Sequence, residues 1–141
     1  MKYQKQKKFY GDFLNQLQWN YFGTFTSSFR LTSKGARRAI ERFTDKFSQE
    51  YGGCQIFFAC EKYKIKEGFH IHCLIKINPT FLPTDYKAKK AISNTWNIIL
   101  RGNSKTSKSQ SVYLKKYNKK LRGAWYVSKL VHQPNADYDF L

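Results

Sequence analysis

Two neighbouring segments, residues 54–62 and 68–77, constrain the fold of this chain most, because both alternate with the period of a β-strand. In the second segment one face carries Phe69, Ile71, Cys73, Ile75 and Ile77, and the other carries His70, His72, Leu74 and Lys76. The first segment divides in the same way, with Cys54, Ile56, Phe58 and Cys60 on one face. Each segment is therefore expected to bury one side of a sheet against an apolar core.

A hairpin closing around Ile65 and Lys66 pairs the two strands in a defined register. On the apolar face this register gives three pairs, namely Cys60 with Ile71, Phe58 with Cys73 and Ile56 with Ile75. Matched apolar pairs fix a register when one face is buried, because a slip by one residue would expose the whole set. We therefore expect this antiparallel pairing at the centre of the sheet.

The same register predicts a metal site on the face away from that core. Glu61 falls opposite His70, and the small Ala59 falls opposite His72, which leaves space above the two imidazoles. A mixed nitrogen and oxygen ligand set suits Mn²⁺ or Mg²⁺, and the thiols of the two strands face the other way. The alternative is that His70 and His72 are ordinary polar residues on a half-exposed strand, and the sequence leaves both interpretations open.

The remaining elements surround this hairpin. Strands are expected at residues 19–26, 111–117 and 138–141, and helices at 34–50, 84–100 and 121–131. Thr32 or Ser33 is available as the N-cap of the first helix and Thr84 as that of the second, while Gly52 and Gly53 end the first. The order predicts an α+β fold, a central antiparallel sheet with flanking helices, in a single domain over residues 19–141. Residues 1–18 form either a basic arm or a short helix.

The charge of the chain indicates a polyanionic partner. Twenty-six Lys and Arg residues stand against nine Asp and Glu residues, a net charge of +17, and such an excess favours salt-dependent nucleic-acid binding. No apolar run approaches the roughly 18 residues that span a bilayer, and the basic start lacks the apolar stretch of a secretory signal. We expect a cytoplasmic protein without membrane contact, whose three cysteines are reduced core thiols.

A tyrosine could serve as a nucleophile beside such a metal site, becoming a covalent carrier. Tyrosine followed by lysine at the third position occurs five times, so the spacing alone carries little weight in a lysine-rich chain. Tyr126 alone falls in the middle of an expected helix, where Lys129 shares its face. Lys129 could stabilise the phenolate or the charge on a phosphate. A core aromatic on an amphipathic helix is the alternative for Tyr126.

These residues, in this order, resemble the motifs of rolling-circle replication initiators of the HUH endonuclease superfamily. Residues 22–26 (FGTFT) look like the first motif, a strand ending in an FTxT-like stretch. His70-Ile71-His72 matches the second motif, two histidines around an apolar residue, and residues 126–129 (YVSK) match the third. Glu61 stands where many members place an acidic ligand. The resemblance covers roughly residues 19–132, and the ordered set is more specific than any one motif.

The resemblance implies a ferredoxin-like or RRM-like sheet fold and a nicking and joining reaction on single-stranded DNA, at an origin or hairpin. Tyr126 would attack a phosphate and leave a 5′-phosphotyrosine link and a free 3′-OH, with the metal polarising the phosphate. The chain has no GxxxxGK[ST] segment, so a host helicase, and a host polymerase to extend the 3′ end, are implied partners in a prokaryotic or virus-infected cell. It also has one clear tyrosine, not the paired tyrosines of some relatives.

Two rival interpretations remain. Single-tyrosine transposases of the same superfamily share these features but typically have a glutamine four residues after the tyrosine, where this chain has Leu130. A non-catalytic sheet similar to an RNA-recognition domain would use Phe25, Phe57 and other aromatics to stack bases.

A set of polar and basic residues is expected to contact DNA. It combines the threonines of the first motif with the basic positions of residues 101–110 and 113–122: Thr24, Thr26, Arg101, Lys105, Lys108, Lys115, Lys116, Lys119, Lys120 and Arg122.

Overall fold

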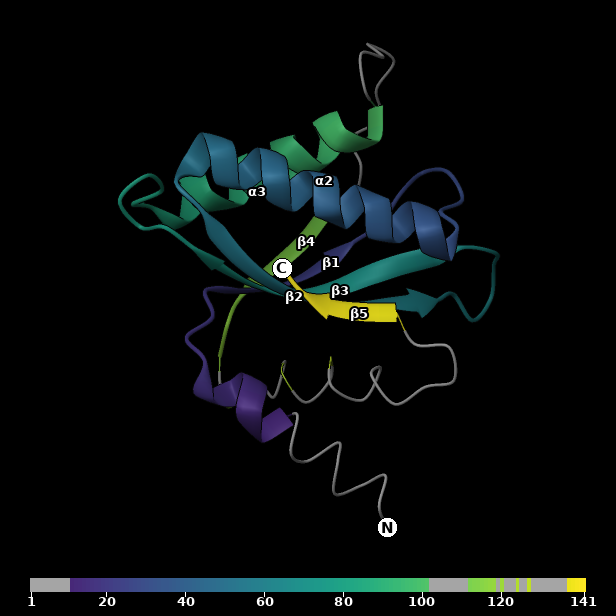
Figure 1. The fold of residues 1–141 in the computed structure, drawn as a ribbon, viewed down its shortest axis with the longest axis horizontal. Coiled ribbons are helices and arrows are strands. Elements are labelled where there is room, and N and C mark those ends of the chain that lie inside the picture. The colour runs from purple at the N-terminus through teal and green to yellow at the C-terminus, as the bar shows by residue number, and fades with distance from the viewer. Residues whose placement is uncertain (1–10, 102–111, 119, 121–123, 125–126, 128–136) are drawn as a thin grey trace.

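The structure, a computed structural model, describes residues 11–101, 112–118, 120, 124, 127 and 137–141. Its elements are, in chain order, β1 (Tyr21–Phe25), α2 (Ser33–Tyr51), β2 (Cys54–Lys62), β3 (Phe69–Ile77), α3 (Asp85–Arg101), β4 (Val112–Lys116) and β5 (Asp137–Phe140). The strands form one sheet in the order β4-β1-β3-β2-β5, and every neighbouring pair is antiparallel. The predicted α+β fold with a central antiparallel sheet and flanking helices is confirmed (Figure 1).

The central hairpin has the predicted register at every position. Cys60 pairs with Ile71, Phe58 with Cys73 and Ile56 with Ile75, and on the other face Glu61 pairs with His70. The tight connection is closed by a backbone hydrogen bond of 3.0 Å from the Tyr63 amide to the Gly68 carbonyl. The apolar pairing inferred from the sequence is therefore what aligns the two central strands.

Both long helices begin at side-chain caps that the sequence predicted. The Thr32 hydroxyl accepts a hydrogen bond of 3.0 Å from the Gly35 amide at the start of α2, and the Thr84 hydroxyl accepts one of 3.2 Å from the Lys87 amide at the start of α3. Gly52 ends α2 in the left-handed conformation, with φ of 77°, which glycine adopts without a steric penalty.

Helices α2 and α3 lie together on one face of the sheet and bury the main core (Figure 1). Fully buried aromatics join the layers, because Phe25 of β1 packs against Phe43 of α2 and Trp96 of α3 with ring centroids 5.1 and 4.8 Å apart. The thiols of Cys60 and Cys73 are buried on this face and are free, as expected for reduced core cysteines. Burial raises the pKa of the Cys60 thiol to about 12, so it stays protonated.

The opposite face of the sheet carries a second apolar core, and the prediction that this face lies away from any core is wrong. Residues 11–16 form a helix below the sheet, purple in Figure 1. This second core consists of Leu14, Trp19, Phe57, Ala59, Leu74, Ala124 and Val127. A short helix and two residues near the chain's end cover this face because its central positions are apolar themselves.

One arginine of helix α2 links the last strand, β5, to the helical layer. Arg37 of α2 forms ion pairs of 2.7 Å with Asp137 and 3.1 Å with Asp139, both on β5. The guanidinium also lies 5.3 Å from the centre of the Phe58 ring. These contacts hold β5 along the outer edge of β2, the strand that carries Glu61.

Two predicted features extend beyond the described residues. The helix expected at 121–131 is described only at Ala124 and Val127, which are both helical and fully buried. Of residues 1–18, the described part consists of the 11–16 helix and the two residues that follow it. Among the helices described, none has the length and hydropathy to cross a lipid bilayer.

Candidate metal centre

Glu61, His70 and His72 meet on the second face of the sheet, at the end of the β2–β3 hairpin. Oε1 of Glu61 lies 3.1 Å from Nε2 of His70 and 3.4 Å from Nε2 of His72. The three ligand atoms all lie within 4.8 Å of one another. We call these residues the triad. Its side chains are only 7–15% exposed, so the site is largely shielded from solvent.

The positions of the triad follow from the strand geometry. His70 and His72 are two residues apart on β3 and so share a face, and Glu61 is the cross-strand partner of His70. Cross-strand neighbours have their Cβ atoms about 5 Å apart, which is why one carboxylate oxygen reaches both imidazoles. Ala59, opposite His72, adds no bulk to the site.

The hydroxyl of Thr24 orients the ring of His72 from the neighbouring strand. Its Oγ1 lies 3.3 Å from Nδ1 of His72, and the two residues are register partners between β1 and β3. When Nδ1 carries the proton and donates to Thr24, Nε2 presents a lone pair toward Glu61. A metal-binding imidazole usually donates the N–H of its other ring nitrogen to a neighbouring group, and this hydrogen bond fixes the tautomer.

The ring of Tyr63 orients His70 by stacking. The two rings are 27° from parallel with centroids 4.4 Å apart, and Nζ of Lys66 lies 4.3 Å from the Tyr63 centroid. Among the described residues, Nδ1 of His70 has no hydrogen-bond partner. Burial lowers the pKa of His70 although the Glu61 carboxylate opposes this shift. The neutral imidazole, the form that binds metals, is therefore favoured.

The chemistry of the triad fits a divalent cation. Two imidazole nitrogens and a carboxylate oxygen converge at separations that one ion could bridge, since metal–nitrogen and metal–oxygen bonds are about 2.0–2.2 Å long. The same arrangement is also compatible with two hydrogen bonds in place of a metal ion, in which the Nε2–H group of each histidine donates to Oε1 of Glu61. Mixed nitrogen and oxygen ligands suit Mn²⁺ and other borderline ions.

Tyr126 and Lys129, predicted as nucleophile and supporting cation, lie outside the described residues, so their roles remain predictions. Val127, which follows Tyr126 in the sequence, is buried in the second core. Ala59, the register partner of His72, belongs to the same core. A described neighbour of Tyr126 in the sequence therefore lies on the triad's face of the sheet.

Apart from the two lysines of β4, the residues predicted to contact DNA fall into three groups. Thr24 is half-buried against His72, and Thr26 is half-buried with its carbonyl accepting a hydrogen bond of 2.9 Å from Trp96 Nε1. Arg101 is the last residue of α3, and Lys120 is exposed. Outside the described residues lie Lys105, Lys108, Lys119 and Arg122.

The two lysines of β4 lie on opposite faces of the sheet. Lys115 pairs with Phe22, which stacks toward His72 with centroids 6.3 Å apart, so Lys115 shares the triad's face. Lys116 pairs with the core residue Tyr21 and contributes to lowering the pKa of Asp85 at the start of α3, so it shares the helical face. The structure thus brings Lys115, and not Lys116, to the triad's side.

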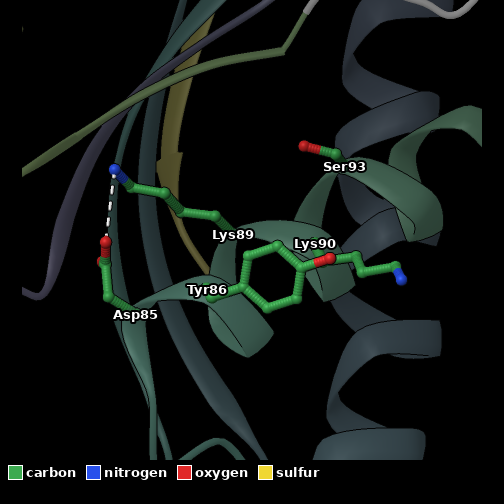
Figure 2. Close-up of a pocket in the computed structure, with 5 residues that line it drawn as sticks. All are labelled: Asp85, Tyr86, Lys89, Lys90 and Ser93. Atoms are coloured by element: carbon green, nitrogen blue, oxygen red, sulfur yellow. Dashed lines mark ion pairs between the residues drawn. The ribbon is translucent and has the colours of Figure 1, made fainter.

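A hollow on α3 lies on the helical side of the sheet (Figure 2). It is lined by Asp85, Tyr86, Lys89, Lys90 and Ser93. Its carboxylate is already engaged, since Asp85 accepts a hydrogen bond of 2.7 Å from the Tyr21 hydroxyl and lies 3.4 Å from Lys89 Nζ. All five lining residues come from one helix, and no histidine or second carboxylate joins them. We therefore base the function on the triad.

Two contacts of the site escaped the sequence analysis. One is the contact of Thr24 with His72, although the alternation of residues 21–25 already placed Thr24 on the face opposite Tyr21 and Phe25. Its expected contact with DNA stays a prediction. The other is the stacking of Tyr63 on His70: the sequence analysis gave Tyr63 no role, although its position two residues after Glu61 placed it on the same side of the strand.

The chain matches no protein-family model, and comparisons with curated proteins and with solved structures found no significant match.

Proposed function

We propose that this chain is a metal-dependent endonuclease that nicks and rejoins single-stranded DNA, similar to the HUH rolling-circle replication initiators. The observation that carries the proposal is the convergence of Glu61, His70 and His72 at 3.1–3.4 Å on one face of the sheet. The net charge of +17 supports a polyanionic substrate. Replication is favoured over transposition because Leu130 stands where the single-tyrosine transposases typically have glutamine.

The triad would hold Mn²⁺ or Mg²⁺, which when bound supplies Lewis-acid polarisation of the scissile phosphate. Thr24 holds the His72 ring through Nδ1, and Tyr63 holds the His70 ring by stacking. Both imidazoles are thus fixed before substrate arrives, which lowers the reorganisation that the reaction would otherwise require. The low exposure of the triad side chains limits the access of competing water.

Tyr126 is the proposed nucleophile, with Lys129 as the supporting cation. The phenol loses its proton, its oxygen forms a bond to phosphorus, and the bond from phosphorus to the 3′ oxygen breaks. The 3′ oxygen takes up a proton, leaving a free 3′-OH and a 5′-phosphotyrosine, and the reverse attack rejoins the strand. The burial of Ala124 and Val127 on the triad's face supports this assignment.

A non-catalytic sheet that stacks bases on its central aromatics is less consistent with the fold. Phe25 is fully buried in the main core, and Phe57, only 5% exposed, is buried in the second core. Neither ring is available to a base. The rival also assigns no role to the convergence of the triad.

The test incubates the protein with a pool of single-stranded oligonucleotides and Mn²⁺ and measures covalent protein–DNA adducts on denaturing gels. We expect 5′-linked adducts that disappear with EDTA and in Tyr126→Phe. Salt-sensitive binding without adducts in the wild-type protein would reject nicking and favour a binding module.

The matched control is Tyr63→Phe. Tyr63 also has a lysine at the third following position and lies against His70, yet its proposed role requires only the ring. We expect adducts to persist in this variant. Their loss in Tyr63→Phe, together with their retention in Tyr126→Phe, would show that the nucleophile is assigned to the wrong tyrosine.

A further inference from the structure

A row of register partners runs across the sheet from the triad to the β4 edge. His72 of β3 pairs with Thr24 of β1, and Thr24 pairs with Tyr113 of β4. Because cross-strand partners point to the same face, the Tyr113 ring lies on the triad's side of the sheet. With neighbouring strands about 4.8 Å apart, Tyr113 and His72 are separated by about 10 Å at the backbone. A nucleotide can bridge this distance between its phosphate and its base.

Tyr113 is open to solvent and has a cation beside it. The residue is 56% exposed, and Nζ of Lys115 lies 5.6 Å from its ring centre. Lys115 is exposed and projects from the same face, while Val112 and Leu114, which alternate with these two residues along β4, pack against the main core. An accessible aromatic ring next to an ammonium is the combination that holds single-stranded nucleic acid, the ring taking a base and the cation a phosphate.

The opposite direction along this row is blocked. From His72 toward β5 the next partner is Ala59, which is buried within the second core, and only beyond it comes Tyr138. Toward β4, by contrast, the single intervening residue is the half-buried Thr24. A strand of DNA leaving the triad along the sheet therefore meets Tyr113 first.

We propose that Tyr113 and Lys115 form a nucleotide-binding subsite in which Tyr113 stacks a base of the single-stranded DNA whose phosphate lies at the triad. This subsite rests on the proposed function for the identity of its ligand. Tyr113 is then a substrate-positioning residue, and Lys115 neutralises the adjoining phosphate. Loss of the ring should weaken DNA binding without altering the charge of the protein.

The experiment measures binding of a fluorescein-labelled, mixed-sequence single-stranded oligonucleotide by anisotropy, in EDTA so that no cleavage intervenes. Tyr113→Ala is expected to weaken binding about 5- to 150-fold, since stacking of one base contributes roughly 1–3 kcal/mol and 1.4 kcal/mol is a factor of ten. Tyr113→Trp should retain affinity. Tyr113→Thr, which removes the ring but keeps a residue suited to strands, should match the alanine variant and so exclude loss of the strand as the cause.

Tyr86→Ala is the matched control. Tyr86 is also exposed and also has a lysine beside its ring, with Nζ of Lys90 5.7 Å from the ring centre (Figure 2), but it lies on the helical side of the sheet. Its removal should leave affinity unchanged. A contribution of Lys115 to phosphate binding should appear in Lys115→Gln as a decrease of about 0.7 in the slope of log affinity against log salt, whereas Tyr113→Ala should keep the wild-type slope.

Wild-type affinity in both Tyr113→Ala and Tyr113→Thr would overturn the subsite, as would an equal loss in Tyr86→Ala. Failure of the proposed function is distinguishable from either result. If wild-type protein forms no adduct with Mn²⁺ but Tyr113→Ala still weakens binding in EDTA, nicking is rejected and base stacking stands.

Discussion

Replacing Thr24 by valine should weaken metal binding without disturbing the fold. Valine keeps the shape of the side chain and its suitability for a strand, but it removes the hydroxyl that lies 3.3 Å from Nδ1 of His72. Losing such a supporting contact typically lowers metal affinity about 10- to 100-fold. Thr24→Ser, which keeps the hydroxyl, is the matched control.

The size of the effect follows from the stabilisation that a ligand confers on the folded state. At a metal concentration about 100 times its Kd, the wild-type protein gains about 2.7 kcal/mol. With an unfolding entropy of roughly 2.1 cal/mol/K per residue, a chain of 141 residues gains about 9 °C in its unfolding midpoint. At the same concentration the valine variant should gain only about 1–5 °C.

The assay is thermal unfolding monitored by circular dichroism, with and without Mn²⁺, in wild type and both variants. Thr24→Ser should retain most of the wild-type shift. A shift in Thr24→Val equal to that of the wild-type protein would refute the role assigned to Thr24. The absence of any shift in wild type at saturating Mn²⁺ would refute the metal centre itself.

Three further predictions concern other parts of the molecule. Tyr63→Ala should lower Mn²⁺ affinity in the same thermal assay while Tyr63→Phe should not, because the ring face is what orients His70; equal behaviour of the two variants would contradict this. Arg37→Met should lower the free energy of unfolding by about 1–2 kcal/mol in urea titrations, since it frees β5 from α2. The hydrogen bond from Arg37 holds the pKa of the β5 carboxylate Asp139 below its usual range. The stability that this pair contributes is therefore present above about pH 4 and lost on further acidification. If the free energy of unfolding falls with acid in Arg37→Met as it does in the wild-type protein, this pair is excluded as a cause. Replacing Lys105 and Lys108 by glutamine should reduce the slope of log affinity against log salt by about 1.4 for single-stranded DNA, and an unchanged slope would exclude them from the interface.

The central hairpin was predictable from sequence because its information is local. Residues 54–62 and 68–77 each carry an unbroken apolar row on one face, and a hairpin closing around Ile65 and Lys66 pairs these rows, so the bounds of β2 and the Glu61–His70 pair follow directly. The caps at Thr32 and Thr84 were equally local. Where the geometry of an element depends on one short segment, the residue pattern of that segment is sufficient to predict it.

The second core and the role of Thr24 could not be predicted, because they depend on pairings between distant segments. The 11–16 helix is too short to show a helical period, and its burial rests largely on Leu14. Placing Thr24 beside His72 requires the register between β1 and β3, two strands separated by all of α2 and β2. The sequence left that register undefined, so Thr24 was assigned to DNA through its motif alone.

All three triad residues belong to one hairpin and fall within residues 61–72. The proposed metal ligands are therefore separate in the sequence from the residues that we propose to bind DNA. Changes at the outer strands or in the basic segments should alter how tightly and where nucleic acid is held while leaving the cation's ligands intact. For the proposed nuclease, substitutions outside the hairpin could therefore change the preferred DNA while leaving the three proposed metal ligands unchanged. The short distance along the backbone also means that the ligands can assemble early in folding, before the edges of the sheet are in place.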